Sequence, residues 1–117
     1  MDYQFTNDKP IYLQLMEVFK VAIVSGELPK GQRLESVRDL AVVAKVNPNT
    51  MQKALAELER IGLVRTERTS GRIITDDEEL ILNMKKELAE KEIQAFLEKM
   101  KSMGLTKDAV IKMIEEM

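Results

Sequence analysis

The stretch from Val46 to Val64, "VNPNTMQKALAELERIGLV", constrains the fold more than any other part of the sequence. Asn47 is a favourable N-cap because its side-chain oxygen can accept a hydrogen bond from a free N–H of the first turn. Pro48 then occupies the first helical position, where its missing N–H costs nothing. Apolar residues follow on one face at helical spacing, namely Met51, Ala54, Leu55, Leu58 and Ile61. Because Gly62 suits the position just beyond a helix end, the stretch predicts an amphipathic helix that begins at Pro48.

The front of this helix carries amides, a hydroxyl and an amine, and its first carboxylate is Glu57. Most solvated helix starts favour Asp and Glu, which complement the positive end of the helix dipole. Amide and hydroxyl groups beside free backbone N–H groups suit phosphates and base edges instead. The alternative interpretation is a simple cap with a solvated face. The neighbouring segments distinguish this alternative from a DNA-binding surface.

Two further helices are predicted before this one. Apolar residues at helical spacing mark a helix from Pro10 to about Ser25, and a loop, "ELPKGQRL", follows it. Ser36 caps a second helix, whose buried side contains Leu40 and Ala44. A connection of only two residues then leads to Asn47. Two short helices joined so closely, the second with a polar front, are typical of a helix-turn-helix.

A β-hairpin is predicted directly after the third helix. In "LVRTERTSGRIIT" two β-favouring runs flank a turn in which Gly71 can adopt a positive φ. Arg68 and Arg72 lie at the tip and Arg65 at the base. Basic residues can merely protect a sheet edge from aggregation, but beside this helix front they favour DNA. The order helix, helix, helix, hairpin predicts a winged helix.

Residues 76–117 are predicted to form a two-helix appendage to a winged helix-turn-helix domain of residues 1–75. A capping box beginning at Thr75 starts a long helix that ends near Gly104, and Thr106 caps a short final helix. Two helices of this length cannot form a core alone. They either fold back or pair with a second copy, and the length of the first helix favours pairing. The apolar residues assigned to dimerisation are Leu80, Ile81, Met84, Leu88, Phe96, Leu97 and Met100.

Composition excludes several other functions. With no His and no Cys, zinc fingers and Cys–His catalysis are excluded, and no phosphate-binding glycine loop is present. We therefore expect neither an enzyme nor a cofactor or metal. No apolar run approaches a membrane span of about 20 residues. Because the chain has no Cys and hence no disulfide, a cytoplasmic protein is expected. Residues 1–75 carry 11 basic and 9 acidic side chains, whereas residues 76–117 carry 7 and 11, which suggests two different roles.

Three stretches resemble the GntR family of bacterial transcription regulators, in particular its short YtrA-like branch. They are "PIYLQLMEVFKVAIVSGELPKGQRLESVRDLA", "VNPNTMQKALAELERIGLV" and the hairpin around Gly71. The resemblance covers roughly residues 9–75, and the tail is similar mainly in length and helical pattern. It implies a mostly α winged-helix protein with a dimerising helical hairpin. Such a protein would be a sequence-specific regulator, expected to be a repressor. It would bind a pseudo-palindromic operator of double-stranded DNA as a homodimer, often at a transporter operon, with no effector identified.

The resemblance also implies particular DNA contacts. They fall on the Arg of a Leu-Pro-Ser-x-Arg motif, on the front of the recognition helix and on the wing, that is, on Arg38, Asn47, Asn49, Thr50, Gln52, Arg68 and Gly71. From their charge we add Lys53, Arg65 and Arg72. The sequence departs from the family pattern at two places. Glu35 replaces the motif's Pro, and Ile73 stands near the place of the wing's usual aromatic residue.

The acidic total charge of −2 keeps a second function open, namely a winged-helix protein-interaction module that binds an acidic partner. The arginines separate the two interpretations. If Arg38, Arg65, Arg68 and Arg72 share a face with the polar helix front, DNA binding is favoured, whereas scattered arginines count against it.

Overall fold

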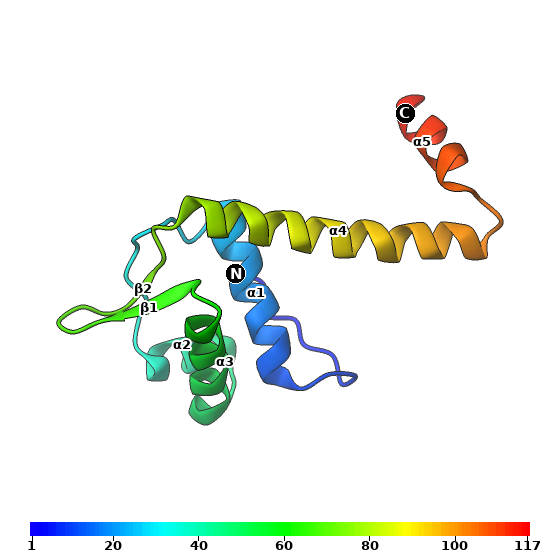
Figure 1. Ribbon diagram of the computed structural model, residues 1–117. Helices are drawn as coiled ribbons and strands as arrows, with labels where there is room; N and C mark the ends of the chain where they lie inside the picture. Colours follow the sequence, from blue (N-terminus) through cyan, green and yellow to red (C-terminus); the bar gives the residue numbers. More distant parts are fainter. The chain divides into compact units, whose positions relative to one another are not determined.

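The computed structural model describes all of residues 1–117, and Figure 1 shows the order of its elements. The order helix, helix, helix, hairpin, helix, helix confirms the predicted fold class. None of the helices combines the length and the apolar character needed to cross a membrane. The elements are α1 (Ile11–Ser25), α2 (Val37–Ala44), α3 (Pro48–Arg60), β1 (Val64–Glu67), β2 (Gly71–Ile74), α4 (Glu78–Ser102) and α5 (Lys107–Glu115).

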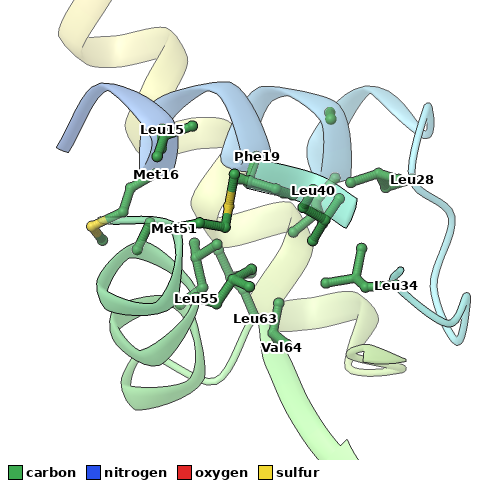
Figure 2. Packing of buried hydrophobic residues seen from close by; sticks show 14 of the residues in the cluster. Leu15, Met16, Phe19, Leu28, Leu34, Leu40, Met51, Leu55, Leu63 and Val64 are labelled. Carbon is green, nitrogen blue, oxygen red and sulfur yellow. The ribbon is translucent and has the colours of Figure 1, made fainter. Parts of the chain in front are cut away.

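The core lies where α3 packs against α1, α2 and β1. Figure 2 shows Phe19 of α1 beside Met51 and Leu55 of α3, and all three are fully buried. Leu28 and Leu34, from the connection between α1 and α2, are also buried in this cluster. Each such side chain contributes about 1.5–3 kcal/mol through burial. Helix α3 is therefore held along its whole apolar face.

Side-chain caps fix the predicted helix starts at three places. Ser36 Oγ accepts a hydrogen bond from the N–H of Asp39 at 3.1 Å. The N–H of Asn49 donates to Asn47 Oδ1 at 2.7 Å. Thr106 Oγ1 accepts from the N–H of the third residue of its helix at 3.1 Å. These caps satisfy N–H groups that the helices leave without intrahelical partners.

The predicted cap of α4 at Thr75 was wrong. Asp77 Oδ1 accepts the N–H of Leu80 at 3.0 Å, so Asp77 caps the helix. Thr75 Oγ1 instead accepts the N–H of Asp77 at 3.0 Å and shapes the preceding turn. Thr75 is itself buried, and its N–H donates to the carbonyl of Leu63 at 2.9 Å. This tertiary contact leaves Thr75 part of the sheet region rather than of the helix.

The hairpin is wider than the sequence indicates. Strands β1 and β2 pair in antiparallel register, with Val64 opposite Ile74 and Thr66 opposite Arg72. The loop predicted between α1 and α2 extends this sheet by one short pairing, an antiparallel bridge between Arg33 and Ile73. Leu34 N–H donates to the carbonyl of Arg72 at 2.9 Å. Strand β2 is therefore hydrogen-bonded along both edges, to β1 on one side and to the α1–α2 connection on the other.

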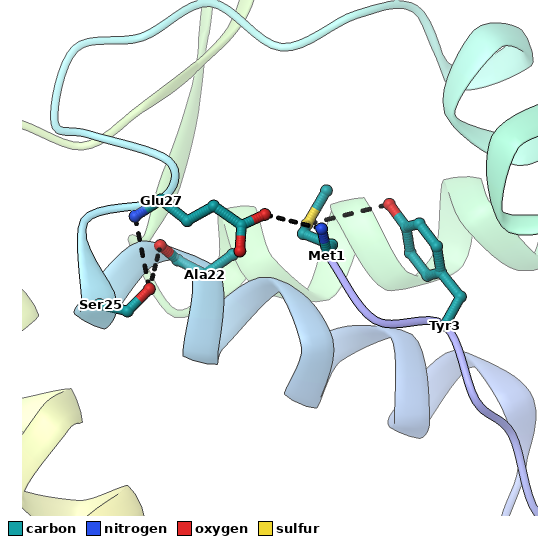
Figure 3. A network of polar contacts seen from close by, with 5 residues as sticks. All are labelled: Met1, Tyr3, Ala22, Ser25 and Glu27. Carbon is teal, nitrogen blue, oxygen red and sulfur yellow. Dashed lines mark hydrogen bonds and ion pairs between the residues drawn. The ribbon is translucent and has the colours of Figure 1, made fainter.

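The chain ahead of α1 is also held in place, as Figure 3 shows. The amino group of Met1 lies 2.7 Å from Glu27 Oε2, and the Tyr3 hydroxyl lies 3.8 Å from the sulfur of Met1. Glu27 N–H donates to Ser25 Oγ at 3.3 Å, and that hydroxyl donates to the carbonyl of Ala22 at 3.2 Å. These contacts tie the first residues to the end of α1.

Two compact units make up the chain, residues 1–84 and residues 85–117. Leu80, Ile81 and Met84 of α4 are partly buried against the core of the first unit. At Gly62, whose φ is +85°, an added Cβ would lie 3.2 Å from Leu80 Cδ2, so a glycine permits this approach. The first turns of α4 therefore complete the winged-helix core, and the functional division after Thr75 stays a prediction.

Candidate nucleic-acid interface

The front of α3 presents uncharged polar groups to solvent. Asn47, Asn49 and Gln52 are exposed, Thr50 is half-buried, and the first turn contains no acidic residue. Because Asn47 uses its oxygen for the cap, its NH₂ group remains free to donate. The exposed surface offers amide and hydroxyl groups together with the helix N-terminus, which is a suitable arrangement for phosphates and base edges.

Lys53 connects this surface to α1. Its Nζ lies 4.0 Å from the ring centroid of Tyr12. A cation in this position is attracted to the negative face of the ring by about 0.5–1 kcal/mol. The two side chains line a shallow hollow of about 430 Å³, together with Pro10, Ile11, Asn49 and Thr50. Lys53 therefore places its positive charge beside the polar front of α3.

The wing is joined to the recognition helix through Glu59, a residue of α3 that the sequence analysis did not single out. Glu59 Oε1 accepts a hydrogen bond from Arg72 Nε at 2.5 Å and another from Thr66 Oγ1 at 2.8 Å. Arg72 Nη1 lies 3.4 Å from Gln52 Oε1. Gln52 and Glu59 are seven residues apart, hence on one face of the helix. This spacing in the sequence could have placed Glu59 on the same face as the predicted contact residue Gln52.

Opposing effects act on the Glu59 carboxyl. Burial raises its pKa. The hydrogen bonds from Arg72 and Thr66 and the charge of Arg72 lower the pKa by more than burial raises it, so the pKa of Glu59 is below its ordinary value. The carboxylate therefore stays ionised at neutral pH. An ionised Glu59 holds the Arg72 guanidinium by a charge-assisted hydrogen bond, the stronger kind.

The structure does not bring all the predicted arginines together. Arg65 and Arg72 occupy strand positions whose side chains point to opposite faces of the hairpin. Arg65 Nη2 lies 2.8 Å from Asp76 Oδ2, and its Nε lies 3.3 Å from Glu67 Oε1. Arg65 is thus engaged away from Gln52, whereas Arg72 is in contact with it.

Arg38 and Arg68 retain free charges. Both are exposed, and neither takes part in any ion pair of the structure. Gly71 ends the turn with a φ of +77°, a conformation that disfavours side chains. The space around Gly71 is open, with nothing within 4 Å of an added Cβ. The wing tip is therefore accessible and can approach another molecule closely.

The predicted dimerisation residues divide between two sides of α4. At 3.6 residues per turn, Leu80, Ile81, Met84 and Leu88 fall on one side, and the first three pack on the winged-helix core. Leu97 and Met100 fall on the other side and Phe96 between the two, at the far end of the helix. The first three residues thus have an intramolecular role, and the dimerisation role stays a prediction.

A helix-turn-helix followed by a wing, with a recognition helix of exposed amides and hydroxyls, defines the class of winged-helix DNA-binding proteins. Residues 11–74 match the family described as "Bacterial regulatory proteins, gntR family". The chain belongs to the GntR family.

Individual relatives agree with this assignment. The chain is 40% identical over 115 residues to the HTH-type transcriptional regulator YhcF of Bacillus subtilis (strain 168). The aligned residues make up 98% of this chain and 95% of YhcF. It is 41% identical over 68 residues to the transcriptional repressor YtrA of the same organism, covering 58% of this chain and 52% of YtrA. A GntR family transcriptional regulator from Listeria monocytogenes has a similar structure, with a TM-score of 0.86, 34% identity and coverage of 97% and 99% of the two chains.

These likenesses confirm the predicted family and the winged-helix fold. The protein is a DNA-binding transcription regulator, and its family is not one of enzymes. The individual contacts with DNA were not tested by any of these comparisons, so the site residues remain predictions.

Proposed function

We propose that the protein acts in the cytoplasm as a homodimeric repressor that binds a pseudo-palindromic DNA operator. The observation that carries the proposal is the exposed front of α3, whose amides and hydroxyl stand without a carboxylate in the first turn. The likeness to the repressor YtrA supports the sign of regulation. In this proposal the front of α3 enters the major groove, where Asn and Gln side chains recognise base edges.

Backbone contacts would come from the flanking cationic residues. Arg38 in α2 and Arg68 at the wing tip are exposed and free of carboxylate partners. Lys53 stands beside Asn49 and Thr50 at the front of α3. Contacts of this kind fix the register of a protein on the duplex and provide affinity for any sequence. Gly71 would let the wing backbone approach the DNA.

Dimerisation would use the exposed apolar side of the tail. Helix α4 has no buried residue, and Val110 is the only buried residue of α5. Large apolar side chains stay exposed in residues 85–117, namely Ile93, Phe96, Met103, Ile111, Met113 and Ile114. Large apolar side chains left exposed to water in such number indicate an interaction site. A second copy offers the same surface in a two-fold arrangement, and two linked domains fit a palindromic operator.

The alternative of an acidic protein partner receives less support. Two of the four arginines that would attract such a partner, Arg65 and Arg72, already pair with carboxylates of the chain itself. The exposed groups at the helix front are mainly amides, which suit base edges more than carboxylates.

Selection of bound sequences from random duplex DNA tests the proposal. We expect enrichment of an inverted repeat whose half-sites are centred about 34–36 Å apart, or a multiple of that distance. A reporter gene placed behind the selected site should be silenced when the protein is expressed. Failure to enrich any sequence would overturn the proposed function, and activation of the reporter would overturn its sign.

A further inference from the structure

We propose that Arg72 is a specificity-determining residue that acts through Gln52. By holding the amide oxygen of Gln52, it makes the recognition helix select guanine over adenine at the base that Gln52 contacts. This inference rests on the proposed function, because it assumes that the front of α3 enters the major groove.

The guanidinium of Arg72 is fixed before any DNA arrives. Its side chain is only 19% exposed, and Nε donates to Glu59 Oε1 at 2.5 Å. Thr66 Oγ1 donates to the same carboxylate oxygen at 2.8 Å, so Glu59 is held from strand β1 as well. A guanidinium held in this way keeps Nη1 beside Gln52, at 3.4 Å from Oε1. Gln52 is itself exposed.

The chemistry of the two groups determines which way the amide faces. A guanidinium has only N–H donors and no acceptor. The Gln52 amide must therefore turn its oxygen toward Arg72, which directs its NH₂ group to the other side. An unrestrained glutamine can present both its oxygen and its NH₂ to a base. Gln52 instead combines with Arg72 into a surface of N–H donors.

The major-groove edges of adenine and guanine differ in their pattern of hydrogen-bond donors and acceptors, and a surface of N–H donors distinguishes them. Adenine shows an acceptor at N7 and a donor at its N6 amino group, and glutamine recognises it by using both amide atoms. Guanine shows two acceptors, N7 and O6. A donor surface matches both guanine acceptors, whereas the adenine amino group would face the positive guanidinium. The structure therefore favours guanine at this position.

The test is selection from random duplex DNA with the full-length protein and three variants, Gln52→Ala, Arg72→Met and Arg68→Met. Arg72→Met keeps a long side chain but removes every donor. Arg68→Met is the matched control, because it removes one wing charge without touching Gln52. Circular dichroism and thermal unfolding establish that each variant is folded.

We expect the wild-type protein to enrich guanine over adenine by about tenfold at one position of each half-site, within the range of a single base contact. Gln52→Ala should abolish the base preference at that position. Arg72→Met should move it toward adenine, because the freed amide can then use both atoms. Arg68→Met should weaken binding to all sequences and leave the preference unchanged.

Several results would overturn the inference while leaving the proposed function intact. One is an enriched palindrome in which Gln52→Ala flattens no position. Others are adenine at that position in the wild type, or a guanine preference that persists in folded Arg72→Met. Should Arg72→Met fail to fold, the wild type and Gln52→Ala still identify the base that Gln52 reads. If no sequence is enriched at all, the proposed function itself is overturned.

Discussion

Helices α3 and α4 both carry apolar residues at helical spacing, yet they use them differently. The 13 residues of α3 include four buried ones, whereas none of the 25 residues of α4 is buried. Helix α3 contacts three elements of its own unit. On α4, by contrast, Leu82, Ile93 and Phe96 are 65%, 55% and 44% exposed. Apolar spacing thus predicts a face that requires a partner, but it does not show whether the partner is in the same chain.

Charges explain how α4 can remain helical with an exposed apolar side. Glu78 and Glu79 lie in its first turn, and Lys99 and Lys101 lie in its last turn. Both sets complement the helix dipole, each by about 0.3–1 kcal/mol. These local interactions stabilise the helix itself, whereas α3 is stabilised by the core. The tail is therefore suited to provide a surface rather than a core.

The largest effect should come from Phe19→Ala in the core. Phe19 is fully buried, so we expect a loss of about 3–5 kcal/mol in the free energy of unfolding. The same change at exposed Phe96 should cost about 0.5 kcal/mol or less in dilute, monomeric protein. Urea denaturation measures both. Equal losses at the two positions would mean that the tail has a core of its own.

Phe96→Glu should next separate binding from folding. A charge on the dimer surface should reduce operator affinity by about 10²–10⁴, the advantage of linking two binding modules. The thermal midpoint of the winged helix should stay unchanged. Gln94→Glu is the matched control, since Gln94 is exposed and lies two residues from Phe96, on the opposite side of the helix. If both variants lose affinity alike, charge rather than dimerisation is responsible.

Arg38→Ala should have a smaller effect that applies equally to all sequences. Losing one phosphate contact should reduce the salt dependence of binding by about one unit of slope. Arg65 is already paired with Asp76 and Glu67, so Arg65→Ala should change the slope less. Titration of one duplex at several salt concentrations measures this. A larger change for Arg65 would place the DNA on the opposite face of the wing.

The smallest expected effect is on the pH dependence of stability through Glu59. The pKa of Glu59 is lowered in the folded state, so its ionised carboxylate stabilises the fold. This stabilisation is fully present above the ordinary pKa of 4.5. It is lost as the pH falls through the lowered folded-state pKa. The difference in unfolding free energy between wild type and Glu59→Gln should therefore shrink in acid. Urea titrations from neutral pH downward measure it, and a difference that is constant down to strong acid would contradict the assignment.

Local chemistry made much of the fold predictable from the sequence. The caps at Ser36, Asn47 and Thr106 depend on residues two or three positions away, so their patterns were sufficient. The cap of α4 was not predictable in the same way, because Thr75 and Asp77 can both serve. The choice depends on the burial of Thr75 against Leu63, a tertiary contact.

The candidate site was predictable as a set of exposed groups but not as a network. The composition of the α3 front indicated polar groups, and the structure shows them exposed. The link from Gln52 through Arg72 to Glu59 requires the hairpin register, which places Arg72 opposite Thr66 and both of them toward Glu59. Charge alone could not separate Arg72 from Arg65, since only their strand positions differ.

Sedimentation equilibrium of the full chain beside residues 1–84 tests the division of roles most directly. The cut belongs after Met84, because Leu80, Ile81 and Met84 cover the winged-helix core. We expect the full chain to have twice its 13.4 kDa mass and residues 1–84 to be monomeric with an unchanged cooperative thermal transition. A dimeric fragment, or a monomeric full chain at high concentration, would contradict the assignment of the tail as the dimer surface.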